Sequence, residues 1–246
     1  MPDTLLRRYG LAPEEIERRS LELIEAAIPN CSGWTSEARE VVKRMVYAAG
    51  DLALCGLTHV HPEAVEATVE ALRARAPIVC DVRMVAAGLR RSSNPVHVAI
   101  DAPPSSAGGI TRTAAGIQQL ARELDGGLAV IGNAPTALLA LLDMVDAGEC
   151  LPAAIIGTPV GFVAAAEAKR ELIARTVPYV TVEGTRGGSA VAAAAMNALL
   201  IAAGRPPGIA EAATGSTPSL RAATATGQEQ SDAGVHSAGR KARGRD

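Results

Sequence analysis

Residues 128–163 of the chain read LAVIGNAPTALLALLDMVDAGECLPAAIIGTPVGFV. Two short apolar runs, 128–131 and 153–156, stand on either side of a helical pattern over residues 135–147. A strand, a helix and a second strand in this order predict a βαβ unit, in which the two strands are parallel and are covered by helices. This stretch therefore indicates an α/β fold.

The rest of the chain continues the alternation. Three further apolar runs, at residues 77–81, 96–100 and 179–182, have the length and composition of buried strands. We therefore expect an α/β fold of three layers, with a mostly parallel five-stranded sheet and helices on both faces. The predicted helices cover residues 13–28, 35–49, 62–75, 111–124, 135–147, 163–175 and 189–203, and a helix or loop begins at Met84–Gly88.

The composition changes after Ala203. Residues 204–246 are rich in Gly, Pro, Ala, Ser and Thr and have no helical or strand periodicity, so they would bury almost no apolar surface. The sequence thus predicts one α/β domain at residues 1–203 and a disordered tail at residues 204–246. The tail has six basic and four acidic residues, which is more typical of a solvated end than of a binding arm.

Charge and composition exclude several classes of protein. The net charge is −2, which argues against binding to nucleic acid or to an anionic membrane surface. The start of the chain, Met1-Pro2-Asp3, lacks the pattern of a signal peptide. The longest apolar run, residues 190–203, is shorter than the roughly 20 residues that a membrane span needs. We expect a cytoplasmic protein.

No metal or disulfide framework is expected. Cysteines at positions 31, 55, 80 and 150 have neither the CxxC nor the CxxH spacing of zinc sites, and Cys80 is interpreted as a reduced core thiol. His59 and His61 precede a predicted helix and would form at most a weak two-histidine metal site, whereas His97 lies in a predicted strand. Nucleotide-binding and hydrolase motifs such as GxGxxG, GxxxxGK and GxSxG are absent from the sequence.

The loops after the strands are the places to look for a site. In an open parallel sheet, ligands bind beyond the carboxyl ends of the strands. Asp81-Val82-Arg83 follows the first of these strands, and glycine-bearing loops at residues 132–136, 157–162 and 183–189 follow three others. Glycine lets the backbone approach a ligand, and free N–H groups at the start of a helix favour anions.

Two arginines add to this pattern. Arg112 and Arg186 could each bind a carboxylate through the forked donors of the guanidinium group. A ligand with several carboxylates is therefore expected. The alternative is structural, because Gly and Pro are common in turns between strands and helices for backbone reasons alone.

Seven segments in register carry a resemblance to a known family. They are Ile16 to Ser20, residues 44–50 (RMVYAAG), 76–85 (APIVCDVRMV), 111–115 (TRTAA), 131–138 (IGNAPTAL), 156–163 (IGTPVGFV) with Glu167 and Lys169, and 184–190 (GTRGGSA). Together these segments resemble the precorrin-8X methylmutase family over residues 13–200. The resemblance implies a homodimeric isomerase of cobalamin biosynthesis that moves a methyl group from C-11 to C-12 of a tetrapyrrole, with the substrate near the subunit interface. It implies no external cofactor.

The resemblance also implies site residues. Tyr47 stands where the family motif R-M-I-H-A-x-G has its catalytic histidine. The residues expected to bind the substrate are Ser20, Arg44, Asp81, Arg112, Asn133, Thr136, Gly187, Gly188 and Ser189.

The exchange of histidine for Tyr47 matters chemically. A histidine, with a reference pKa of about 6.5, can carry a proton at neutral pH, whereas a tyrosine, at about 10, stays a neutral phenol that still donates one hydrogen bond. Three interpretations stay open: Tyr47 is the donor, Tyr47 is only a packed residue, or His59 or His61 replaces the missing group. The matching functions are an active methylmutase and a tetrapyrrole-binding paralogue without catalysis. A third possible function is that of an unrelated anion-binding α/β enzyme.

Overall fold

The computed structural model describes Leu5, Gly10 and residues 12–28, 33–103 and 109–204. The strands are β1 (Thr58–Val60), β2 (Ile78–Cys80), β3 (Val96–Val98), β4 (Leu128–Ile131), β5 (Ala154–Gly157) and β6 (Tyr179–Val182). The helices are α2 (Pro13–Ala27), α3 (Ser36–Ala49), α4 (Leu54–Leu57), α5 (Ala64–Arg73), α6 (Arg83–Gly88), the 3₁₀ helix η1 (Ala99–Asp101), α7 (Arg112–Gln119), α8 (Ala121–Leu124), α9 (Pro135–Asp146), α10 (Ala165–Ile173) and α11 (Ser189–Ala203). Cys31 and residues 205–246 of the predicted tail lie outside the described residues.

The described strands form one six-stranded sheet in the order β1-β6-β5-β4-β2-β3. Neighbouring strands from β6 to β3 are parallel, which confirms the predicted mostly parallel sheet. The structure adds the edge strand β1, which pairs antiparallel with β6 so that His59 lies opposite Thr181. The carboxyl ends of the parallel strands therefore lie together at one end of the sheet. We call this end the carboxyl edge, which is distinct from the edge strands β1 and β3.

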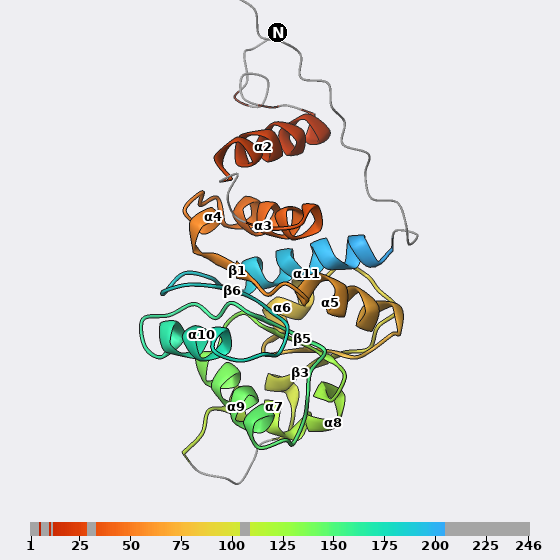
Figure 1. Cartoon of the computed structure of the whole chain (residues 1–246), viewed down its shortest axis with the longest axis vertical. Helices are drawn as coiled ribbons and strands as arrows, with labels where there is room; N and C mark the ends of the chain where they lie inside the picture. The colour runs from red at the N-terminus through yellow and green to blue at the C-terminus, as the bar shows by residue number, and fades with distance from the viewer. Residues whose placement is uncertain (1–4, 6–9, 11, 29–32, 104–108, 205–246) are drawn as a thin grey trace, which may run out of the picture. The chain divides into compact units, whose positions relative to one another are not determined.

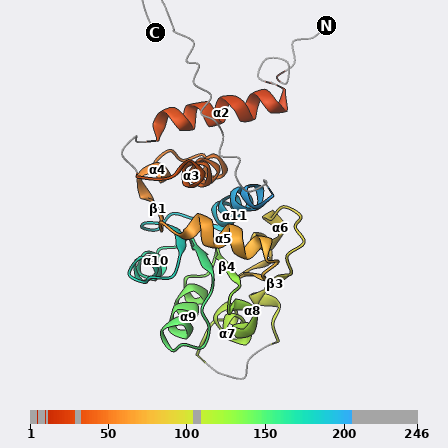
Figure 2. The ribbon, with the colours of Figure 1, turned by 45° about the vertical axis from the view of Figure 1, so that its right-hand side comes forward.

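Helices cover both faces of the sheet (Figures 1 and 2). Alternate strand residues explain why: Ile78 and Cys80 of β2 belong to one apolar core, whereas Val79 belongs to the other. The first core also includes residues of α3, α5 and α11, and the second includes residues of α7, α9 and α10. Cys80 is fully buried and unpaired, as expected for a core thiol, and burial raises its pKa to about 12.

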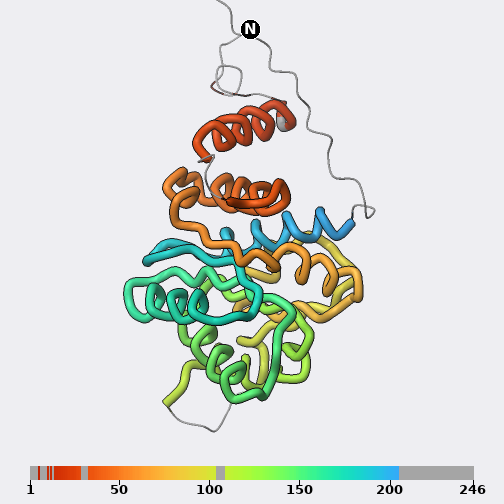
Figure 3. The backbone as a smooth tube through the Cα atoms, viewed as in Figure 1, coloured from red at the N-terminus to blue at the C-terminus, as the bar shows by residue number. Residues whose placement is uncertain are grey.

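Helices α11, α3 and α2 pack on one another in this order. The Thr35 hydroxyl caps the start of α3, and Gly50 ends the helix in the left-handed conformation. Val42, Met45 and Val46 of α3 are buried, and α3 packs on α11. Figure 3 shows the result: the blue tube of α11, the last described helix, lies between the orange α3 and the sheet.

Two buried threonines at the sheet differ in their hydrogen bonds. The Thr181 hydroxyl donates to the Gly157 carbonyl at 2.5 Å. Thr158 is also fully buried, but its hydroxyl is the single buried side-chain oxygen or nitrogen among the described residues without a partner. Since a buried polar group without a hydrogen bond costs free energy, the two hydroxyls should differ in their effect on stability.

We predict that Thr158→Val leaves the free energy of unfolding unchanged or raises it, because valine keeps the shape and removes an unpaired hydroxyl. The matched Thr181→Val variant should lose about 1 kcal/mol, because it breaks a made hydrogen bond. Urea unfolding measures both. Equal losses in the two variants would contradict the prediction.

Candidate functional site

The loops that follow the parallel strands are tied to one another at the carboxyl edge of the sheet. The Gly188 N–H donates to the Thr158 carbonyl at 2.8 Å, which joins the loop after β6 to the loop after β5. Gly161 N–H donates to Thr185 O at 3.1 Å between the same two loops. The glycine-bearing loops predicted from the sequence therefore lie side by side.

Asp81 fastens the loop after β4 to the end of β2. One carboxylate oxygen accepts N–H groups from Val82 (3.0 Å) and Gly132 (3.1 Å), and the other accepts those of Asn133 and Ala134, both at 2.7 Å. Burial raises the pKa of the Asp81 carboxyl above its usual value, and these four donors oppose that rise. The side chain is fully buried. In this conformation the Asp81 carboxylate holds the turn. The sequence had suggested a different role, direct contact with a ligand.

The turn at Gly187 and Gly188 requires glycine. Both residues have positive φ, 138° and 120°. A Cβ at Gly187 would lie 2.2 Å from the Thr158 carbonyl oxygen, so no side chain fits there. Helix α11 begins directly after this turn at the buried Ser189, and no side chain caps its first N–H groups. Uncapped N–H groups at the start of a helix can bind an anion.

The starts of α7 and α9 lie together at the same edge. The Thr111 hydroxyl caps α7 through the Ala114 N–H, and its oxygen lies 2.7 Å from the Thr136 hydroxyl oxygen in the first turn of α9. Arg112 follows Thr111, is exposed, and makes no ion pair with the described part of the chain. Asn133 is exposed in the loop before α9. Arg112, Asn133 and Thr136 therefore surround two neighbouring helix starts.

Tyr47 lies on α3 with 41% of its surface exposed. Asp51, four residues further along, accepts a hydrogen bond from the Arg186 guanidinium at 2.8 Å. This ion pair brings the end of α3 to the loop that precedes Gly187. It also occupies Arg186, which the sequence had suggested as a carboxylate clamp.

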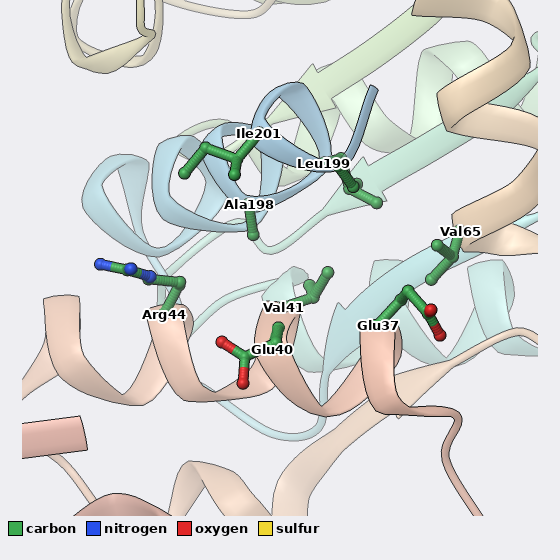
Figure 4. Close-up of a pocket in the computed structure, with 9 residues that line it drawn as sticks. Glu37, Glu40, Val41, Arg44, Val65, Ala198, Leu199 and Ile201 are labelled. Atoms are coloured by element: carbon green, nitrogen blue, oxygen red, sulfur yellow. The ribbon is translucent and has the colours of Figure 1, made fainter. Parts of the chain in front are cut away.

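Ser20 and Arg44 lie away from these loops. The Ser20 hydroxyl donates to the Ile16 carbonyl within α2. Arg44 pairs with Glu17 of α2 and lines a small hollow between α3 and the end of α11, beside Ala198 and Ile201 (Figure 4). Ala198 is about 14 Å along the helix axis from Ser189. Within one chain, Ser20 and Arg44 therefore do not join the residues at the carboxyl edge.

His59 of β1 and His61, which follows the strand, contact other groups; the His61 ring packs edge-on against Tyr179, with 5.5 Å between the ring centroids. His59 lies opposite Thr181, and the neighbouring odd-numbered Tyr179 belongs to the core on the α10 side. Helix α3 belongs to the opposite core. His59 instead pairs with Glu183 at 2.6 Å. No group of three metal-binding side chains occurs in the described residues.

Sequence reasoning gave no role to three residues at this edge. Thr111 carried the signal of a helix N-cap, a threonine just before a helical pattern. Lys169 was part of the resemblance to the methylmutase family. Nothing in the sequence showed that its ammonium group is fully buried and donates to the Arg186 carbonyl. Asp51 carried no signal, because its partner Arg186 is distant in sequence.

Comparison with known proteins gives a consistent result. The family model for precorrin-8X methylmutase matches residues 15–202. A precorrin-8X methylmutase of Pseudomonas aeruginosa is 43% identical over 196 residues, covering 76% of this chain and 94% of that protein. A cobalt-precorrin-8 methylmutase of Priestia megaterium is 36% identical, covering 81% of this chain and 92% of that protein. The crystal structure of precorrin-8X methylmutase from Thermus thermophilus superimposes with a TM-score of 0.70 at 37% identity, covering 76% of this chain and 96% of that one.

We predict that Asp81→Asn destabilises the fold by about 3 kcal/mol, because the amide cannot accept four N–H groups and presents its own donors to them. The control is Asp125→Asn. The exposed Asp125 accepts one backbone N–H, from Leu151 at 3.0 Å, and its loss should cost less than about 1 kcal/mol. Urea unfolding compares the two, and similar small losses would show that Asp81 does not hold the turn.

Proposed function

The chain belongs to the precorrin-8X methylmutase family, and on this basis we propose that it is an isomerase of cobalamin biosynthesis that moves a methyl group from C-11 to C-12 of a corrin precursor. One observation carries the proposal beyond the family: the starts of α7, α9 and α11 meet at one edge of the sheet. A tetrapyrrole with acetate and propionate arms is a polycarboxylate, and helix starts bind carboxylates.

We assign the binding of these arms to particular groups. Arg112 offers a forked guanidinium without a partner among the described residues, and Asn133 and Thr136 lie beside it at the start of α9. The N–H groups after Gly187 and Gly188 offer a second anion site at Ser189. Asp81 acts through the loop that it holds.

The proposed role of Tyr47 is that of a hydrogen-bond donor to the ring. In the methyl shift the bond to C-11 breaks as the bond to C-12 forms, so the substrate needs no external group carrier. A neutral phenol can stabilise charge that develops on the ring during this step, but it transfers a proton less readily than a histidine. The proposal includes no external cofactor.

We predict that Tyr47→Phe lowers turnover of precorrin-8X by about 10²-fold or more, the usual effect of removing a positioned donor. Tyr47→His should turn over the substrate at least as fast as the wild type, because histidine supplies a group that titrates near neutral pH. Anaerobic assays with the metal-free and the cobalt-containing substrate measure these rates. Equal rates for wild type and Tyr47→Phe would eliminate the phenol as donor.

A second candidate function is that of a tetrapyrrole-binding paralogue without catalysis, and Tyr47 at the histidine position is the observation that favours it. The same assays separate the two functions. Tight binding of the product by a wild-type protein that does not turn over, together with activity in Tyr47→His, would identify the paralogue.

We further propose a homodimer formed through the carboxyl edge. Phe162 and Val163, in the loop after β5, are 95% and 85% exposed, and Met84 at the start of α6 is 70% exposed. Side chains of this kind around a site are typical of an interface. Ser20 and Arg44 stay candidates for substrate contact only in a dimer whose second copy brings α2 and α3 to this edge.

We place the protein in the cytoplasm. No helix in the described residues is long and apolar enough to cross a bilayer. The net charge of −2 gives no reason to expect nucleic acid or a membrane surface as partner.

We predict that Phe162→Asp weakens dimer formation at least about tenfold, because a charge would be buried at the interface. Leu151→Asp is the control: Leu151 is 64% exposed but precedes β5 and therefore lies at the amino edge of the sheet. Sedimentation velocity over a concentration series measures the dimer. Equal dissociation of the two variants would exclude the carboxyl edge as the interface.

A further inference from the structure

Lys169 is a fully buried lysine on α10 with one hydrogen bond. Its ammonium group donates to the Arg186 carbonyl oxygen at 2.5 Å, and no carboxylate in the described residues pairs with it. Burial lowers the pKa of Lys169 to about 8. Because burying an amine costs free energy, an apolar residue would serve the core better, and the lysine needs a reason beyond packing.

The partner of Lys169 is held at both of its ends. The Arg186 carbonyl accepts the Lys169 ammonium from α10, and the Arg186 Nε donates to Asp51 Oδ2 at 2.8 Å, just beyond α3. We call these two hydrogen bonds the Arg186 clasp. Helices α10 and α3 belong to the cores on opposite faces of the sheet, so the clasp joins the two sides across the carboxyl edge.

The clasp ends where the glycine turn begins. Gly187 presses against the Thr158 carbonyl, and the Gly188 N–H donates to that same oxygen at 2.8 Å. With both φ values positive and no side chains, these two residues have little intrinsic preference for this conformation. A fixed carbonyl at Arg186 sets the plane of the peptide between Arg186 and Gly187. Together with the hydrogen bond from Gly188 to Thr158, it sets the direction of the N–H groups that follow.

We propose that Lys169 is a positioning residue for the isomerase. Through the Arg186 clasp it orients the uncapped N–H groups that begin at Ser189 toward a substrate carboxylate. The clasp also keeps the end of α3, which carries Tyr47, beside the bound ring. The inference rests on the proposed function for its effect on substrate, whereas the order of the loop is a property of the free protein.

The test compares Lys169→Met with Leu172→Ala. Methionine fills a similar volume but cannot donate, and Leu172 is a fully buried residue of the same helix that takes no part in the clasp. Hydrogen exchange of a peptide covering residues 183–192 reports loop order in the free protein. Loss of a hydrogen bond from a charged donor should speed this exchange at least about tenfold in Lys169→Met, and Leu172→Ala should show no local change beyond its global loss of stability.

The substrate arm of the test gives a separate answer. Lys169→Met should raise KM for precorrin-8X about tenfold or more and lower kcat less, because the loop binds a carboxylate instead of the migrating methyl group. Unchanged exchange and unchanged KM relative to Leu172→Ala would overturn the inference. A wild type without turnover but with fast exchange in Lys169→Met would refute the proposed function and leave the clasp standing.

Asp51→Asn tests the other half of the clasp without entering the core. Asp51 is 37% exposed, so this variant should fold normally. It should speed exchange of the same peptide by a smaller factor and raise KM in the same direction. No change in either quantity would overturn the role of the clasp even if Lys169→Met does not fold.

Discussion

The buried carboxylate of Asp81 is the interaction on which the candidate site depends. By accepting four N–H groups, it joins the end of β2 to the loop after β4 and so sets where α9 begins. Gly132, one of those donors, leaves no space for a Cβ, because Ser189 at the start of α11 lies against it. The Thr136 hydroxyl in turn meets Thr111 before α7. The Asp81 carboxylate thus holds the loop that the starts of α7, α9 and α11 all contact.

The opposite side of the site is arranged differently. The Arg186 clasp is formed by a buried amine and a half-buried carboxylate. Two glycines with positive φ follow it, and their conformation depends on the clasp. Tyr47 stands on α3 near the other end of this clasp. A phenol at this position suits a reaction in which the methyl group moves within one molecule and the protein contributes orientation and one hydrogen bond. Binding of carboxylates and chemistry at the ring are therefore assigned to different elements.

Much of the fold was predictable because apolar periodicity records burial directly. The runs at 128–131 and 179–182 are strands with the same bounds in the structure, and 189–203 is a helix with the same bounds. Strand β1 was missed because it has three residues, one of them His59, and lies at an edge where one neighbour suffices. The site was harder. A strand-terminal aspartate such as Asp81 looks the same in sequence whether it faces a ligand or the backbone, and only the register of β2 against β4 decides. Arg186 looked free because Asp51 is remote in sequence.

A crystal structure of the protein with its corrinoid product bound tests the central claim most directly. The account predicts that the carboxylates of the macrocycle contact Arg112 and the N–H groups at the starts of α9 and α11, with Tyr47 within hydrogen-bond distance of the ring. A macrocycle bound elsewhere would contradict it, for example in the hollow lined by Arg75, Arg90 and Arg91 near the end of α11.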